Sequence, residues 1–425
     1  MEAPQLFDEM PLRKKPTNAP SEAQMDDLQD DVLPIIASFL PAHDAVRTCV
    51  LARRWRHVWT FAPALRITAV KGFGSAKFSD FVDHLLSLRR QGPLLKSCEF
   101  DLVQSEFDFN WYLAVHHVYS HSVQSALDCN VEVLMCRFTP TGAPADFQHQ
   151  LPESATPLLS QHVHRLELDH IPAALDFSGC PALTYLQMER CILLSDSMVS
   201  ASLKHLSITC CELNFRHRTS ISLPNLVHLE LIDCYGRLPL LESLPSLVTA
   251  VVSLRENSTE VCEISDSGCL NDDPCWGCRF AFEFDMDRGS SYFFQGLSRA
   301  THLELSASYN HAYILQRDLK WCPTFPMLKT LLLDDWCLDA DLSVVIHFIQ
   351  KSPNLEKLTL DLFEEFDSSM VTEGSNLPLA EASVFDHLKM VEIKCEKIDG
   401  RVDKVLKILN RCGISQKKID IQQTD

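Results

Sequence analysis

The sequence predicts an α/β fold in which a short helical unit precedes a solenoid of repeats built around a curved parallel sheet. Two observations lead to this prediction. The 425 residues include 60 leucines, about 14% of the chain, and from residue 160 onward one spacing recurs: apolar, two others, leucine, one other, apolar. In residues 25–67, by contrast, the apolar residues follow the i, i+3, i+4, i+7 spacing of amphipathic helices.

Composition excludes several classes of protein. The 38 Lys and Arg against 57 Asp and Glu give a net charge of −19, which argues against binding of the nucleic-acid backbone. Only 13 glycines leave little material for phosphate-binding loops, and an odd count of 17 cysteines argues against a closed set of disulfides.

Residues 1–24 contain four prolines and no basic start followed by an apolar run, so we expect a disordered tail and no secretory signal. The early apolar run at 32–42 is too short to span a bilayer. Arg13-Lys14-Lys15 is a short candidate nuclear signal or simply part of a solvated tail. We expect a protein of the nucleus and/or cytoplasm, with reduced cysteines and without membrane or nucleic-acid partners.

Three short helices are expected in residues 25–67. The first has apolar positions 32, 35, 36, 39 and 40, with Asp30 as its N-cap and Pro41 at its end. The second runs from about 44 to 50, and the third carries Trp55 and Trp59 on one face and ends at Pro63. Helices this short bury little surface, so large apolar side chains must lie near the exterior, which favours docking onto a partner.

The same residues resemble an F-box, in particular that of plant F-box proteins that continue into leucine-rich repeats. The resemblance rests on the runs 28–33, 38–41 and 44–56 and on Trp59, although Gln29 stands where the family usually has proline. It implies that this unit binds a Skp1-like adaptor and, through it, a cullin. The residues that match the adaptor-facing positions are Leu28, Leu33, Ile36, Val46, Leu51, Trp55 and Trp59. An ordinary helical subdomain packed on the rest of the chain is the alternative. The arginines of this unit are interpreted as a charged rim around the apolar docking face rather than as a nucleic-acid-binding helix.

Residues 161–388 carry the repeats. Their central positions are 166, 186, 206, 229 and 250, which are 20 to 23 residues apart, and then 303, 331, 358 and 391, which are 27 to 33 apart. Such periods are typical of leucine-rich repeats, whose strands line a concave face. Cys191, Cys211 and Cys234 occupy the Asn-or-Cys position of the pattern, where a buried thiol fills the turn.

Three segments depart from the regular repeat. Residues 68–160 are expected to form atypical capping repeats, with a helix around 78–88 and strands at 97–103 and 131–138. An insertion at 255–300 interrupts the array. Residues 389–425 have a strand–helix–strand pattern, with the helix at 402–410 and Gly413 as its stop, and resemble the FBD-type tail of the same plant proteins.

No catalytic constellation, cofactor site or metal site is predicted. Four cysteines of the insertion, Cys262, Cys269, Cys275 and Cys278, have only half of the spacing of a zinc site, so free thiols are the favoured interpretation. His116, His117 and His121 lack carboxylate or thiol support and are interpreted as surface histidines. The resemblance likewise implies no catalysis in this chain, because the chemistry of such ligases belongs to a separate E2 enzyme.

The outward positions of the repeat strands are acidic. Two such positions on each of nine strands hold eight acids and one base, which predicts an acidic concave surface for a basic segment of an unidentified protein substrate. The candidates are Glu167, Glu189, Glu230, Glu304, Asp334, Asp361 and Glu392. The alternatives are a protein that is acidic everywhere, and a small molecule bound between repeats.

The expected function is that of a substrate-recognition subunit of a Skp1–cullin–F-box ubiquitin ligase. A leucine-rich-repeat scaffold outside any ligase, with a degenerate F-box, is the alternative.

Overall fold

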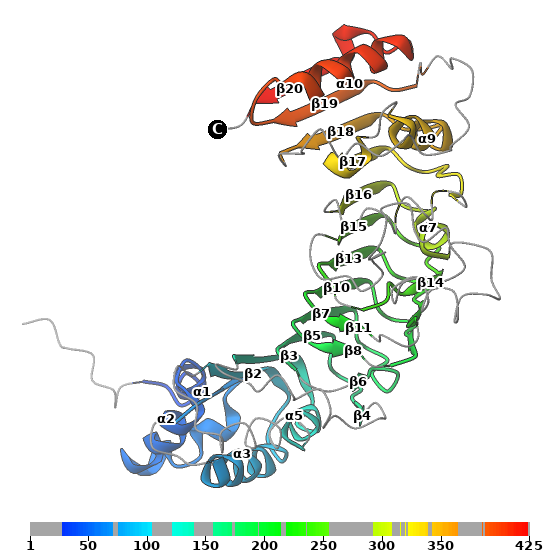
Figure 1. Cartoon of the computed structure of the whole chain (residues 1–425). Coiled ribbons are helices and arrows are strands. Elements are labelled where there is room, and N and C mark those ends of the chain that lie inside the picture. Colours follow the sequence, from blue (N-terminus) through cyan, green and yellow to red (C-terminus); the bar gives the residue numbers. More distant parts are fainter. Residues whose placement is uncertain are drawn as a thin grey trace, which may run out of the picture.

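The computed structural model is an arc of stacked repeats whose long sheet lines the concave side (Figure 1). It describes residues 28–70, 75–103, 121–139, 156–171, 175–193, 195–213, 218–234, 236–254, 292–307, 315, 319, 322–338, 342–363, 385 and 387–423. The α/β prediction is confirmed, because thirteen parallel strands form one continuous sheet behind an N-terminal helical unit.

The main sheet has the order β1-β2-β3-β5-β7-β10-β13-β15-β16-β17-β18-β19-β20, so that each strand pairs with the strand of the next repeat. Its strands are β1 Ala64–Thr68, β2 Leu95–Val103, β3 Val131–Thr139, β5 Arg165–Asp169, β7 Tyr185–Glu189, β10 His205–Thr209, β13 His228–Ile232, β15 Thr249–Leu254, β16 His302–Ala307, β17 Thr330–Asp334, β18 Lys357–Leu362, β19 Met390–Cys395 and β20 Ile419–Gln423. Short strands on the convex side form three small sheets: β4 Thr156–Pro157 with β6 Leu175–Asp176, β8 Ile192–Leu193 with β11 Glu212–Leu213, and β9 Ser197–Val199, β12 Ser220–Ser222 and β14 Leu240–Ser243.

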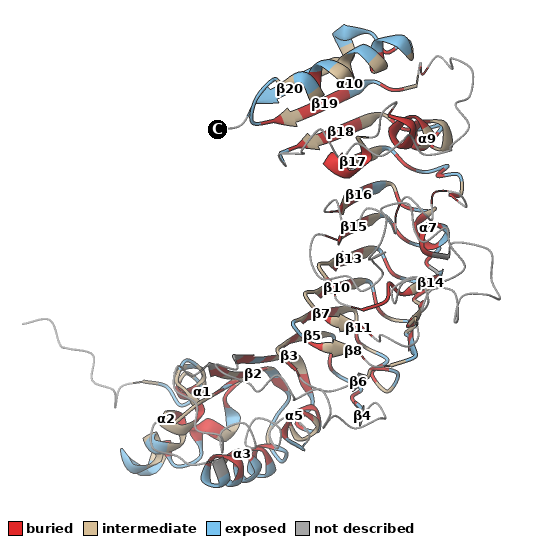
Figure 2. Ribbon diagram, in the orientation of Figure 1, coloured by how far each residue is buried: buried red, intermediate tan, exposed pale blue. Residues whose placement is uncertain are grey.

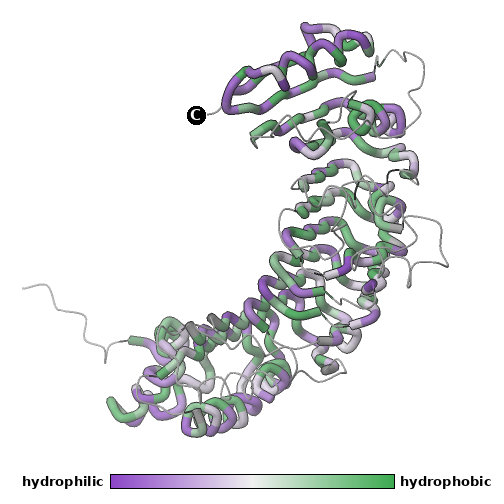
Figure 3. The backbone as a smooth tube through the Cα atoms, in the orientation of Figure 1, coloured by the Kyte–Doolittle hydropathy of each residue, from purple (hydrophilic) through white to green (hydrophobic). Residues whose placement is uncertain are grey.

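The predicted repeat register is the register of the sheet. Positions 166, 186, 206, 229, 250, 303, 331, 358 and 391 pair directly from strand to strand, and every one of them is at most 1% exposed. Ala250 pairs with Leu303, so the register passes across the insertion without a shift. Side chains alternate along each strand, so one face packs into the core and the other lines the concave side, an alternation that also appears as hydropathy in Figure 3.

The N-terminal unit differs in detail from the expected three helices. Its elements are α1 Leu33–Ser38, α2 Ala42–Arg47 and the 3-10 helices η2 Thr48–Val50, η3 Arg53–Trp55 and η4 Val58–Phe61. Two 3-10 turns replace the predicted third helix. The prediction that Asp30 caps α1 is wrong, because the N-cap is Val32. The Asp30 carboxylate instead accepts a hydrogen bond from Arg54 Nη2 at 2.7 Å.

The remaining helices lie at the two ends of the array and in its later repeats. They are α3 Ser75–Arg89, α5 Val123–Leu127, α7 Tyr292–Leu297, η9 Asp335–Cys337, α9 Ser343–Lys351, α10 Gly400–Arg411 and η11 Gln416–Lys418. The expected helix and strands of the first repeats are α3, β2 and β3, and the C-terminal strand–helix–strand is β19–α10–β20. Asp399 caps α10 by accepting from Arg401 N at 2.9 Å, and Gly413, at φ +80°, follows its end. Whereas α9 is buried, α10 exposes its outer side (Figure 2).

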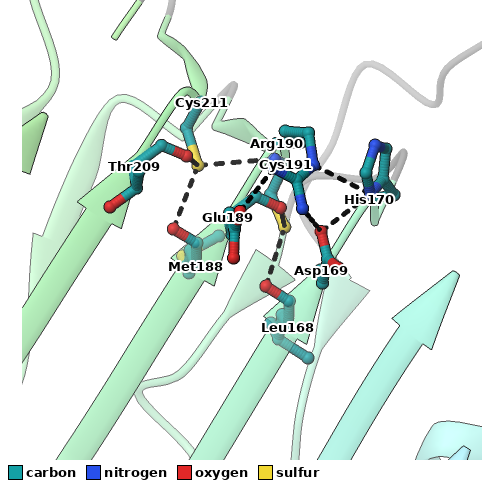
Figure 4. Close-up of polar contacts among 9 residues, drawn as sticks. All are labelled: Leu168, Asp169, His170, Met188, Glu189, Arg190, Cys191, Thr209 and Cys211. Carbon is teal, nitrogen blue, oxygen red and sulfur yellow. Dashed lines mark hydrogen bonds and ion pairs between the residues drawn. The ribbon is translucent and has the colours of Figure 1, made fainter. Parts of the chain in front are cut away.

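The three repeat cysteines form a ladder at the turn that follows each strand. Arg190, which precedes Cys191, adopts a left-handed conformation, as does the residue before each of the other two cysteines. Cys191 Sγ donates to Leu168 O at 3.5 Å, and Cys191 N donates to Cys211 Sγ at 3.3 Å (Figure 4). Burial raises the pKa of the Cys191 thiol, so it stays protonated and able to donate. The predicted turn-filling role is confirmed.

Replacing Cys211 by alanine is therefore expected to lower the free energy of unfolding by about 1 kcal/mol, because Met188 O loses its thiol donor and a small void remains. Urea denaturation measures the change. The matched control is Cys210→Ala, one residue earlier and only half-buried, which should stay within about 0.5 kcal/mol of the wild type. Equal losses in the two variants would contradict a specific role for the ladder.

Candidate protein-interaction surfaces

The seven residues matched to adaptor-facing positions do not share one environment. Leu33, Trp55 and Trp59 are 1%, 4% and 6% exposed and belong to the core. Leu28, Ile36 and Val46 are half-buried and pack against that core. Leu51, at 62%, is the one of the seven that is largely exposed.

Other apolar side chains of the same unit are exposed. Phe39 and Val50 are 76% and 82% exposed, and Ile35 and Phe61 are 50% and 56% exposed. Such side chains at the ends of very short helices cannot reach the interior. We call Ile35, Phe39, Val50, Leu51 and Phe61 the exposed apolar residues of the helical unit. Four of them were missed from the sequence, where the only available signal was that so small a unit holds more large apolar residues than it can bury.

The concave face carries three rows of side chains, each formed by equivalent positions of successive strands. The central row is Arg66, Glu99, Met135, Glu167, Gln187, Ser207, Glu230, Val251, Glu304, Leu332, Thr359, Glu392 and Asp420. On the strands of the main sheet from β5 to β18, a second row lies two residues earlier, and we call it the upstream row: Arg165, Tyr185, His205, His228, Thr249, His302, Thr330 and Lys357. The acidic surface predicted from the sequence comprises residues of the central row and of the row after it, and the upstream row was missed.

Basic residues of the same face pair with many of its acids. Glu167 contacts Arg165 at 2.6 Å and Arg137 at 3.9 Å. At the other end Lys357 Nζ lies 2.9 Å from Glu392 Oε2, and this hydrogen bond is the main cause that lowers the pKa of Glu392.

Two further acids meet at a strand end. Asp169 and Glu189 both pair with Arg190, beside His170 (Figure 4).

The remaining candidate acids lie in different environments. Asp334 is 6% exposed, and both of its carboxylate oxygens accept from Ala307 N at 3.2 Å, so it joins the end of β17 to the end of β16. Asp361 is half-buried. Glu304 is exposed and makes no ion pair with any residue that the structure describes.

A stack of planar groups runs along the upstream row. Arg165 Cζ lies 3.8 Å above the ring centre of Tyr185. Tyr185 and His205 stack at 4.2 Å with 3° between their planes, and His205 and His228 stack at 4.5 Å with 9°. Burial, followed by the neighbouring His228, lowers the pKa of His205, so this ring favours the neutral state.

Glu230 joins this stack to the central row. Its carboxylate accepts from Ser207 Oγ at 2.7 Å and contacts His228 Nε2 at 2.9 Å. Burial alone would raise the pKa of Glu230, but the hydrogen bonds from Ser207 and His228 outweigh it and lower the pKa. Glu230 is therefore an oriented carboxylate at ordinary pH.

His205, His228 and Glu230 also form a group of metal-ligating type that was not foreseen from the sequence. One ligand atom of each lies within 4.8 Å of the others. Imidazole lone pairs lie in the ring plane, and the two rings are nearly parallel, so their lone pairs do not converge on one point. A metal ion would require one ring to leave the stack.

Other sequence expectations fall outside the described residues. The four cysteines of the insertion lie there, as do His116 and His117. His121 is described and exposed. No helix within the described ranges has the length and apolar character needed to cross a bilayer.

Relatives of the chain are found in two plants. An F-box/FBD/LRR-repeat protein of Arabidopsis thaliana is 23% identical over 436 residues, covering 94% of this chain and 92% of that protein. The MEIOTIC F-BOX protein MOF of Oryza sativa subsp. japonica is 25% identical over 355 residues, covering 79% and 71%. For an F-box/LRR-repeat protein of Arabidopsis thaliana, 25% identical over 305 residues, the match spans 57% of this chain and 64% of the relative, less than two thirds of its length.

No protein-family model matches the chain. Its parallel solenoid behind a short helical unit nevertheless agrees with these similarities, one of which extends over nearly the whole chain. The protein is a homologue of the plant F-box/leucine-rich-repeat proteins.

Proposed function

We propose that the protein is a non-catalytic substrate-recognition subunit of a Skp1–cullin–F-box ubiquitin ligase. Its helical unit binds a Skp1-like adaptor and through it a cullin, and its solenoid binds a protein target. The observation that carries the proposal is the set of exposed apolar residues of the helical unit, which are 50–82% exposed. Apolar surface of this kind marks a docking site.

The junction between the helical unit and the solenoid supports these two separate binding roles. The sheet begins at Ala64, three residues after η4 ends, and Pro41 forms a bridge with Arg66 of β1. The helical unit therefore continues directly into the solenoid. A rigid junction holds a bound target at a fixed place relative to the adaptor, as transfer of ubiquitin by a separate E2 enzyme requires. We place this activity in the nucleus or cytoplasm.

Adaptor binding is tested with the double variant Val50→Asp/Leu51→Asp. Two carboxylates in an apolar interface would be desolvated without partners, so affinity for a plant Skp1 is expected to fall about 100-fold or more. Surface plasmon resonance with the purified full chain measures the affinity, and thermal unfolding should remain unchanged because both side chains are exposed.

The matched control is Leu159→Asp/Val199→Asp, which introduces the same charges at residues 61% and 58% exposed on the solenoid. It should bind Skp1 like the wild type. Wild-type affinity of the Val50/Leu51 variant would rule out docking through these residues. A wild-type chain that does not bind Skp1 at all would instead favour a scaffold outside any ligase.

A further inference from the structure

The stack of the upstream row is closed at one end and open at the other. At the β5 end the chain's own Arg165 guanidinium caps the ring of Tyr185. At the β13 end the stack stops at His228, because the next residue of the row is Thr249. Among the described residues, His205 is the only ring that stacks on His228, so one face of His228 is turned toward β15 and has no aromatic partner.

At this open end the concave residues of β15 have short side chains, and we call this place the step at β15. Its three concave positions hold Thr249, Val251 and Ser253, none of them charged or aromatic. On its far side β16 presents His302 and Glu304, both exposed. Strands lie about 4.8 Å apart, so His228 and His302 stand about 10 Å from each other across the step.

Two carboxylates flank the same step. Glu230 lies on β13 and is held by Ser207 and His228. Glu304 lies on β16 in the same row, with only Val251 between the two. Glu304 is exposed and has no ion pair with a described residue, whereas Glu167, Glu189 and Glu392 already have basic partners.

An open ring face beside two carboxylates favours a guanidinium over an ammonium as the bound cation. A guanidinium is planar, stacks on rings and pairs with carboxylates through a fork of donors, whereas an ammonium is a compact, strongly hydrated point charge. The chain itself shows the arrangement at the other end of the stack, where Arg165 lies over Tyr185 and pairs with Glu167. An anion is excluded by the two carboxylates.

We propose that the step at β15 binds an arginine side chain of the target protein. The guanidinium stacks on the open face of His228 and pairs with Glu304, while Glu230 adds a second acceptor. Val251 supplies an apolar floor for the methylene chain. The proposal rests on the proposed function for its biological setting, because it names the chemistry of the target segment that the solenoid accepts.

The test uses the full-length protein and two fluorescent probes of equal charge, an acetylated hexa-arginine peptide and an acetylated hexa-lysine peptide. Anisotropy titrations at about 0.1 M salt limit long-range attraction to the protein's net charge. The wild type is expected to bind hexa-arginine about fivefold or more tightly than hexa-lysine. Glu304→Gln should weaken hexa-arginine about fivefold, and His228→Ala should abolish most of the preference for arginine.

Two variants separate this site from general acidity and from altered packing. Glu242→Gln makes the same charge change on β14 of the convex side, where Glu242 is exposed, and should leave both affinities unchanged. His228→Phe restores a stacking face and should retain the preference for arginine. Equal affinity of the two peptides, or equal losses in Glu304→Gln and Glu242→Gln, would overturn the proposal.

Skp1 binding by the same variants keeps the two proposals apart. Each concave-face variant should bind Skp1 like the wild type, because the step lies on the solenoid. If the variants lost no Skp1 binding and the wild type showed no preference for arginine, only the proposal of an arginine site would be contradicted. If the wild type preferred arginine but did not bind Skp1, only the proposed role in a ubiquitin ligase would be contradicted.

Discussion

Replacing Arg89 by alanine is expected to lower the free energy of unfolding by about 3 kcal/mol and to loosen the junction between the helical unit and the solenoid. Arg89 ends α3 and is 0% exposed. Its Nη1 donates to Pro93 O at 2.6 Å and its Nη2 donates to Ala62 O at 3.2 Å. Ala62 closes the helical unit, so one side chain joins that unit to the loop before β2.

The cost comes from what remains when the side chain is removed. A cavity opens, and two backbone carbonyls lose donors in a site closed to water. Gly92 shows how tightly the site is packed, since a Cβ there would lie 2.3 Å from Arg89 Nη1 and 2.6 Å from Thr60 O. Burial lowers the pKa of Arg89. An arginine nevertheless stays charged and keeps both donors.

Denaturant unfolding and amide hydrogen exchange check this prediction. In Arg89→Ala, exchange should accelerate first around residues 58–68 and 89–97. The control is Arg90→Ala, because the neighbouring Arg90 is exposed and its ion pair with Asp128 lies at the surface, where such pairs contribute up to about 1 kcal/mol. If both variants lose the same stability, Arg89 is not the tie between the two parts.

Much of the solenoid could be predicted because each repeat repeats one physical requirement. A buried strand needs apolar residues at alternate positions, and parallel stacking aligns equivalent positions of successive repeats, so Leu206 and Leu229 had to pair once the period was known. The turn cysteines followed from the same period. The insertion did not disturb the register, because the strands on both sides carry the pattern.

The sites were harder to predict, for two physical reasons. In the helical unit apolar residues occur on every side of helices that are only a few residues long, so the packing of the turns decides exposure: Trp55 is buried whereas Val50 is exposed. On the concave face the positions of the acids could be predicted from the sequence. Whether an acid is neutralised depends on ion pairs between side chains of neighbouring strands, such as Arg137 and Glu167, and these could not be predicted. Extending the period-2 pattern by one step would have revealed Tyr185, His205 and His228.

Truncating Trp55 to alanine is the second large effect that we expect, about 3 to 5 kcal/mol lost from the helical unit. Trp55 is 4% exposed, and the unit rests on few buried side chains of its size. Skp1 binding should weaken as well, because only the folded fraction binds and the apparent dissociation constant rises as that fraction falls. Hydrogen exchange across residues 33–62 should speed up without Skp1 and slow again at saturating Skp1, since binding stabilises the folded form.

Phe61→Ala provides the opposite case within the same unit. Phe61 is 56% exposed, so its truncation should change stability by less than about 0.5 kcal/mol, and we expect it to weaken Skp1 binding by an order of magnitude with unchanged hydrogen exchange. Comparison of these two variants thereby distinguishes a loss of stability from a loss of Skp1 contacts. If Trp55→Ala kept its stability and lost Skp1 directly, the buried tryptophan would itself be a contact residue, and the exposed apolar residues of the helical unit would not be the docking surface.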